Sequence, residues 1–288
     1  MKKHLLFLLF IIFSECTESN LAFHPGTNPS DGILKLVKNF GGSKNDVAKS
    51  VVSTLDGGFA VLGYTQSIDG DVTDKATEDY DFWMLKFDSE AQLEWNKTYG
   101  GSGDDRGSSI IETSDGGYAL LGYSDSTDGD VSSNNGNRDF WLVKITASGV
   151  LTWQKSFGYE GLDEGVSVIE TSDNHLMLSG VLDVTASGGE GNQGRLYNRH
   201  AGGDYWSIKI TPTGDIVWSR FYGGTFTDSP TGIKETLNDG FISVGGSDSN
   251  DVDISNNKGS YDFWIVKSNL NGDIVWEKSF GGSEIDEA

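Results

Sequence analysis

The chain has 288 residues, with 43 Asp and Glu against 21 Lys and Arg, which gives a formal net charge of −22. This surplus of negative charge repels phosphate backbones and anionic lipid surfaces, so it excludes nucleic acid as a partner. With 36% hydrophobic residues and eight Trp, the chain carries enough apolar surface for a large core. Its single Cys cannot form an internal disulfide.

Residues 1–16 have the pattern of a secretory signal. Lys2 and Lys3 precede an apolar run over residues 5–13, and the only cysteine, Cys16, follows closely. Nine apolar residues are too few to cross a bilayer of about 30 Å as a helix. We therefore expect secretion across the inner membrane rather than a transmembrane anchor.

The position of Cys16 resembles the lipobox of bacterial lipoproteins, in which the Cys is acylated and becomes the mature N-terminus. Glu15 precedes it, where such proteins usually have Gly or Ala, and ordinary cleavage nearby with a free thiol is the alternative. Thr17, rather than Asp, after the Cys resembles the pattern of lipoproteins sent to the outer membrane of a Gram-negative cell. Residues 17–31 are polar, contain Pro25 and Pro29, and predict a flexible tether, so the only membrane contact expected is the N-terminal lipid.

The rest of the chain is one repeat. The triplet Asp-aromatic-Trp begins at Asp81, Asp139, Asp204 and Asp262, with spacings of 58, 65 and 58 residues, and a second Trp follows each triplet. An aromatic-Gly-Gly turn comes next, and an Asp lies five residues past its first Gly. We divide a repeat domain over residues 32–288 into units of about 43–101, 102–158, 159–224 and 225–282.

Each unit contains four short runs rich in β-branched and aromatic residues, bounded by Gly, Asn and Asp. In the second unit these runs predict strands over residues 109–113, 118–124, 140–146 and 151–157. Runs such as FAVLGY and FWLVKI are apolar at successive positions, so both of their faces must be covered, as in stacked blades. We predict an all-β, β-propeller-like array of four four-stranded repeats with almost no helix.

The motifs GGSxxD, TxDGG, DGDV, D-[FY]-W and WxK together resemble the repeats of about 60 residues in bacterial secreted proteins and lipoproteins that are described as β-propellers, similar to kelch-like and delta-60 repeats. The resemblance implies a propeller fold and is silent on activity. Residues 33–40 match the last strand of a unit and predict one additional N-terminal strand. The array is then an open or truncated ring, and a tight four-bladed ring is the alternative.

Several recurring residues are expected to be structural. The triplet tryptophans recur in register, as packing between blades requires, and so do the aspartates after the Gly-Gly turn. A lysine ends each triplet strand, and we expect it to pair either with the triplet Asp or with the Asp after Gly-Gly. These residues are Trp83, Trp141, Trp206 and Trp264; Asp46, Asp105, Asp163 and Asp228; Lys86, Lys144, Lys209 and Lys267.

The loops between the second and third strands are acidic and should emerge on one face. Clustered carboxylates with an intervening Gly are typical of Ca²⁺ loops, although the spacing differs from that of an EF-hand. The alternative is an Asp-Gly turn on a solvated rim. The candidate cation ligands are Asp69, Asp71, Asp128, Asp130, Asp251 and Asp253.

The third unit carries seven extra residues in this loop, over residues 183–203. Insertions on one face of a repeat array often carry function. Its basic, aromatic and amide side chains form a candidate contact site for a glycan or an acidic partner, with a tolerated insertion as the alternative. These residues are Arg195, Tyr197, Asn198, Arg199 and His200.

Signatures of catalysis are missing from the sequence. Four His, no G-x-S-x-G elbow, no P-loop and no Cys after residue 16 leave no nucleophilic or His-rich metal motif. We therefore predict a non-catalytic, envelope-anchored binding module for a glycan or protein ligand, with no cofactor other than Ca²⁺. The alternative is a glycan-directed hydrolase that uses two carboxylates on the loop face.

Overall fold

The computed structural model describes residues 37–192, 199–237 and 239–286. Residues 40–288 form one compact unit, and residues 1–39 form another, of which only 37–39 are described. The described residues are all-β and contain no helix, hence none long and apolar enough to cross a membrane. The signal, the tether and Cys16 lie outside the described residues, as does most of the strand expected over 33–40, of which residues 37–40 form no strand.

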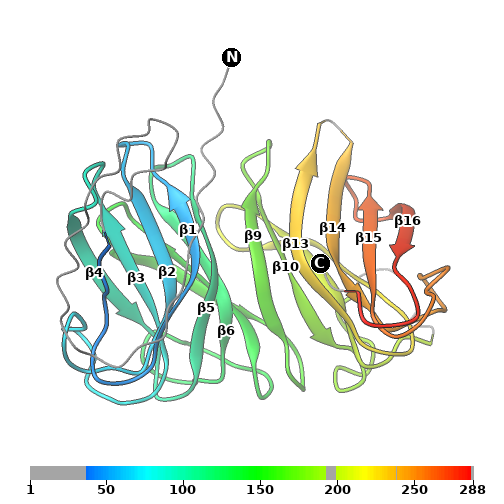
Figure 1. The fold of residues 1–288 in the computed structure, drawn as a ribbon, viewed down its shortest axis with the longest axis horizontal. Coiled ribbons are helices and arrows are strands. Elements are labelled where there is room, and N and C mark those ends of the chain that lie inside the picture. The colour runs from blue at the N-terminus through cyan, green and yellow to red at the C-terminus, as the bar shows by residue number, and fades with distance from the viewer. Residues whose placement is uncertain (1–36, 193–198, 238, 287–288) are drawn as a thin grey trace, which may run out of the picture. The chain divides into compact units, whose positions relative to one another are not determined.

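Sixteen strands form four antiparallel sheets, each made of four consecutive strands (Figure 1). The first sheet comprises β1 (Asp46–Ser53), β2 (Phe59–Thr65), β3 (Asp81–Phe87) and β4 (Leu93–Tyr99). The second comprises β5 (Asp105–Glu112), β6 (Tyr118–Ser124), β7 (Asp139–Ile145) and β8 (Leu151–Phe157). The third comprises β9 (Glu164–Glu170), β10 (Leu176–Asp183), β11 (Gly203–Ile210) and β12 (Ile216–Tyr222). The fourth comprises β13 (Asp228–Thr236), β14 (Gly240–Ser247), β15 (Asp262–Ser268) and β16 (Ile274–Phe280).

The hairpin between the first and second strands is closed by a residue with left-handed backbone in the first three sheets. Gly57 and Gly116 have φ of 89° and 81° in the Asp-Gly-Gly turns of the first two sheets. In the third sheet Asn174 takes this place with φ of 59°, and Asn is one of the few other residues that tolerates this conformation. The turn therefore keeps its shape where its Asp-Gly-Gly motif is lost.

The sheets pack on one another in chain order through one aromatic contact that is repeated three times. The aromatic residue of each triplet meets the triplet Trp of the next sheet. The ring centroids are 4.8 Å apart for Phe82 and Trp141, 5.0 Å for Phe140 and Trp206, and 4.7 Å for Tyr205 and Trp264. All four triplet tryptophans are buried. The contact explains why the triplet recurs: one of its rings faces the preceding sheet and the other faces the next.

Burial along the strands shows which faces the neighbours cover. Every residue of β6 and β7, in the second sheet, is buried. Over residues 241–247 of β14 and 262–266 of β15 burial alternates, because only one face of the fourth sheet is covered there. The array is a propeller-like series of four sheets that is open at the fourth, and the alternative of a tight four-bladed ring is wrong for the described residues.

Candidate ligand-binding site

The loop that carries the extra residues connects β10 to β11, and two hydrogen bonds hold its ends together. Val184 N donates to Gly202 O at 2.9 Å, and Gly202 N donates to the Thr185 hydroxyl oxygen at 2.7 Å. Asp183 Oδ1 caps the first turn of the loop by accepting from Ala186 N at 2.9 Å. The base of the insertion is therefore a fixed structure.

A cavity of about 470 Å³ opens beside this base. Apolar side chains and two polar ones, Asp183 and Thr185, share its wall. The volume lies in the range of small-molecule sites, which combine apolar surface with a few placed polar groups. The lining residues are Leu162, Val181, Asp183, Thr185, Ala186, Gly202 and Gly203.

Two of the five predicted contact residues can be placed. Arg199 is exposed at the end of the insertion, and its Nη2 lies 3.4 Å from Asp251 Oδ2 in the fourth unit. His200 is buried instead, and its Nδ1 lies 2.6 Å from Asp204 Oδ2. Burial lowers the pKa of His200, but the hydrogen bond and charge of Asp204 outweigh it and leave that pKa raised. Arg195, Tyr197 and Asn198 lie outside the described residues.

His200 therefore anchors the insertion. Its Nε2 lies 3.8 Å from Asp253 Oδ2, and its ring packs edge-on against Phe221 with centroids 4.8 Å apart. The adjacent Ala201 N donates to Gly224 O at 2.9 Å. The contacts of His200 with Asp253 and of Arg199 with Asp251 tie the insertion to the fourth unit. They also keep Gly202 and Gly203 in place at the cavity.

An arginine cluster that sequence reasoning missed lies next to the cavity. Arg138 forms a β-bridge with Leu162 of the cavity wall, and its Nη1 lies 2.6 Å from Glu164 Oε1. Its guanidinium also stacks over Tyr123 at 4.4 Å. Arg138 Nη2 lies 3.7 Å from Asp104 Oδ2, which links it to the start of β5 in the same sheet.

Arg106 continues the cluster across the first two sheets. It pairs with Asp104 at 2.7 Å and stacks over Tyr80 at 4.2 Å and Tyr64 at 5.1 Å. Both arginines stand where the other units have no basic residue: Arg106 follows the recurring Asp, and Arg138 precedes a triplet. Departures from the repeat consensus are the sequence signal that would have found them.

The predicted cation ligands already accept hydrogen bonds from the Gly-Gly turn. In each of three units one carboxylate accepts from the first Gly and another accepts from the Ser or Thr after the second Gly. The distances are 2.9 Å for Asp71 and Gly41, 2.7 Å for Asp69 and Ser43, 3.2 Å for Asp130 and Gly100, 2.7 Å for Asp128 and Ser102, 3.4 Å for Asp253 and Gly223, and 3.0 Å for Asp251 and Thr225. Among the described residues, no three His, Cys, Asp or Glu are grouped to hold a metal ion.

Each Asp after the Gly-Gly turn closes that turn. Asp46, Asp105 and Asp228 accept from the backbone N–H of the second Gly at 2.7–2.8 Å, and Asp163 accepts from Tyr159 N at 2.8 Å. Burial raises the pKa of Asp163 to about 7 and that of Asp228 to about 6. Neither Asp163 nor Asp228 lines the cavity, but Asp163 accepts a hydrogen bond at 2.9 Å from the backbone N–H of the lining residue Asp183.

The lysines that end the triplet strands pair with a different Asp from the two expected. Lys144 Nζ lies 2.8 Å from Asp115 Oδ2, and Lys209 Nζ lies 2.7 Å from Asp173 Oδ2. Lys86 and Lys267 make the same contact to Asp56 and Asp239. All four partners belong to the turn between the first and second strands. The expectation of a triplet or Gly-Gly partner is therefore wrong, because antiparallel pairing brings the end of the third strand beside the first hairpin.

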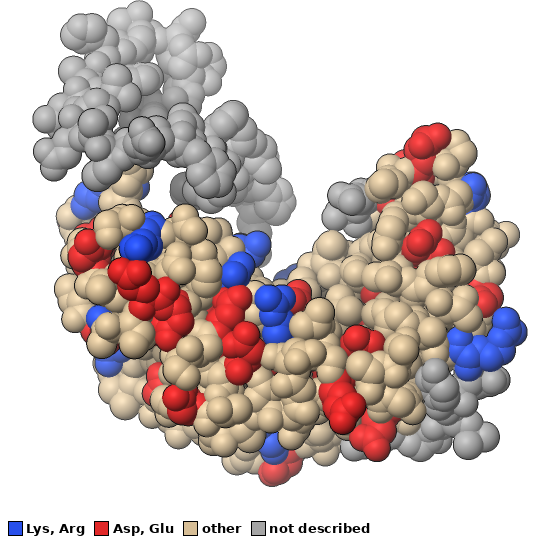
Figure 2. Space-filling model, turned by 90° about the horizontal axis from the view of Figure 1, so that it is seen from below, with Lys and Arg blue, Asp and Glu red and all other residues tan. Residues whose placement is uncertain are grey.

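Figure 2 shows the end of the molecule on which the loops between second and third strands emerge. Carboxylates are spread across it, with Lys and Arg side chains between them. No protein-family model matches the chain, and no curated protein matches it. The fold and the site together define the class: an all-β, propeller-like repeat protein with one modified unit, whose loop borders a cavity.

Proposed function

We propose that the protein is a non-catalytic binding module that holds a glycan or a protein ligand at the insertion of its third unit. The observation that supports the proposal is the cavity at the base of the insertion. Apolar wall residues such as Leu162 suit the C–H face of a sugar ring, while Asp183 and Thr185 suit its hydroxyl groups. The stacked arginines and tyrosines beside it extend the polar and aromatic surface.

The test is a titration of the full chain with a panel of neutral and acidic glycans, followed by calorimetry. Asp183→Asn should weaken binding at least about tenfold, because the amide keeps the acceptor for Ala186 N but loses the negative charge. Asp248→Asn changes the equivalent position of the fourth unit and should leave the affinity unchanged. Equal affinity in both variants, or no glycan bound, contradicts the proposed site. Cleavage of a bound glycan would instead favour the hydrolase.

We further propose that a lipid on Cys16 holds this module at the cell envelope, in the outer membrane of a Gram-negative cell. The support is the apolar run, the isolated Cys and the polar tether of the sequence. Fatty-acid labelling of cells that express the full chain should mark the wild type and not Cys16→Ser. A labelled Cys16→Ser variant, or an unlabelled wild type, contradicts the anchor.

A further inference from the structure

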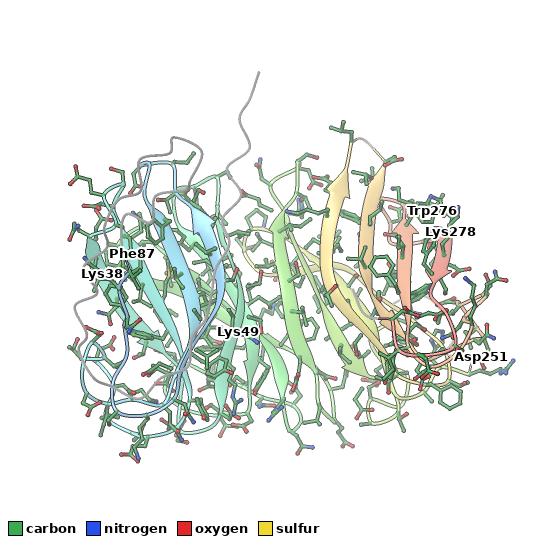
Figure 3. The ribbon with its side chains drawn as sticks, in the orientation of Figure 1. Lys38, Lys49, Phe87, Asp251, Trp276 and Lys278 are labelled. Atoms are coloured by element: carbon green, nitrogen blue, oxygen red, sulfur yellow. The ribbon has the colours of Figure 1, made fainter. Side chains whose placement is uncertain are left out.

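The fourth sheet exposes a face that a neighbouring sheet covers in the other three. Trp276 is 41% exposed and Phe280 is 51% exposed, whereas Trp218, which stands at the position of Trp276 in the third sheet, is 7% exposed. Ile265 and Val244, on the same face, are only half buried. Figure 3 shows Trp276 and Lys278 on β16, at the outer edge of the fourth sheet.

In the other sheets this Trp makes a standard contact with the next sheet. Trp95 packs on Tyr118 with ring centroids 6.4 Å apart, and Trp218 packs on Phe241 at 6.1 Å. The indole also covers the hairpin between the third and fourth strands of the next sheet, where the backbone is left-handed and the residue is Gly149, Gly214 or Gly272. A Cβ on these glycines would lie 2.8–3.3 Å from the ring, so the contact requires glycine.

The aromatic residue and the cation of the fourth strand join the same interface. Tyr99 donates its hydroxyl to Gly149 O at 2.8 Å, and Lys155 Nζ donates to Gly214 O at 2.9 Å. Phe280 and Lys278 occupy these two positions in the fourth sheet. A shallow cavity of about 200 Å³ continues the exposed face inward beside Ile242 and Val244. The fourth sheet therefore displays the indole, the aromatic ring and the cation of a contact that the chain makes three times, without the hydroxyl that Tyr99 donates.

We infer that this face binds a further four-stranded sheet of the same repeat, with glycine in the hairpin between its third and fourth strands. A second copy of this chain does not offer that sheet. In its first sheet Trp83, Leu85 and Phe87 are no more than 5% exposed, so the matching face is already covered. Ala91, with φ of 57°, also stands in the hairpin position, and its methyl group occupies the space that the indole of Trp276 needs.

The test extends the full chain after Ala288 by a copy of residues 108–158. The extension keeps the repeat in register because Asp286 stands where Asp105 stands. Because the appended sheet is covalently joined to the chain, its effective concentration at the exposed face is high. Hydrogen exchange of the β16 amides should slow at least about tenfold, and the melting temperature should rise. The control carries Leu in place of Gly149 within the appended copy only, and it should lose both effects.

Two outcomes would overturn the inference. One is an unchanged rate of hydrogen exchange of the β16 amides in the extended chain. The appended sheet, which has glycine in the required hairpin, would then not bind the exposed face. The other comes from sedimentation of the unmodified chain, which should be monomeric. A dimer that disappears in Trp276→Ser would assign the face to a second copy.

Discussion

Lys144 Nζ donates to both carboxylate oxygens of Asp115, at 2.9 and 2.8 Å, and so ties the third strand of the second sheet to the turn between its first two strands. The ammonium group is buried, while the carboxylate is largely exposed. Four sheets repeat this arrangement. An ion pair with one buried member is sensitive to loss of its other member, because the buried charge then has no counter-charge.

The first prediction concerns the ion pair between Lys144 and Asp115. Asp115→Asn should lower the free energy of unfolding by about 1–3 kcal/mol, since the buried ammonium group of Lys144 loses its charged acceptor. Lys144→Met should cost less, because it removes the buried charge together with the pair. Urea unfolding of the full chain measures both. Asp125→Asn serves as a control, because it alters a carboxylate of the same unit that takes no part in the Lys144–Asp115 ion pair. A smaller loss for Asp115→Asn than for Lys144→Met would contradict the account.

The second prediction follows from the same carboxylates under acid. Burial raises the pKa of Asp115, but hydrogen bonds from Lys144 and Thr113 outweigh it and lower that pKa to about 2. A carboxyl with a folded-state pKa below its unfolded value contributes stability above the unfolded pKa, near 3.8, and loses it as pH falls toward 2. Melting temperature should therefore fall between pH 4 and pH 2, and less steeply in Asp115→Asn. An equal fall of the melting temperature between pH 4 and pH 2 in the wild type and in Asp115→Asn would contradict the prediction.

The third prediction concerns the buried triplet carboxyls, whose shift has the opposite sign. Burial raises the pKa of Asp139 to about 6 and that of Asp81 to about 7. A group with a raised folded-state pKa stabilises the fold below its unfolded pKa, and this stability is lost as pH rises through the folded value. We expect the melting temperature to decrease from pH 4 to pH 7. Asp139→Asn should flatten the decrease, because its amide oxygen can still accept from Asn135 N.

The fourth prediction concerns Gly100, which lies against one triplet carboxylate and the carboxylate after its own Gly-Gly turn. A Cβ at Gly100 would lie 2.4 Å from Asp81 Oδ1 and 2.7 Å from Asp105 Oδ2. Gly100→Ala should therefore destabilise the protein by about 1–3 kcal/mol through overpacking. Gly232→Ala is the control, because a Cβ there has no heavy atom within 4 Å. Similar unfolding curves for the two variants would show that the close approach carries no cost.

The fifth prediction compares two tryptophans at equivalent positions. Trp218→Ala should cost about 3–5 kcal/mol, because it opens a cavity between the third and fourth sheets and removes the hydrogen bond from Trp218 Nε1 to Leu270 O at 3.0 Å. Trp276→Ala should cost about 1 kcal/mol or less, since nearly half of this side chain is already in water. Chemical denaturation measures both, and equal losses would show that the fourth sheet is covered in solution.

Much of the fold was predictable because strand signals are local. The strands expected over residues 118–124 and 151–157 are β6 and β8, and the other two of that unit differ from β5 and β7 only at their ends. Alternation, β-branched residues and turn glycines act between near neighbours, and the repeat presents them four times. The candidate site was less predictable. The insertion was recognisable by its length, but the cavity wall also takes Leu162 and Val181, which resemble ordinary members of the repeat.

The sequence by itself determined the repeat, the all-β class, the strand positions and the acidic loop face, because these depend on spacing and composition. Only the tertiary structure decided which charges meet. Lys144 binds the turn at Asp115, and His200, expected as a ligand contact, is buried against Asp204. The tertiary structure also decided which aromatic faces are covered, because burial depends on the sheet that arrives from elsewhere in the chain. Trp218 and Trp276 have the same place in the repeat, and only the first has a sheet packed on it.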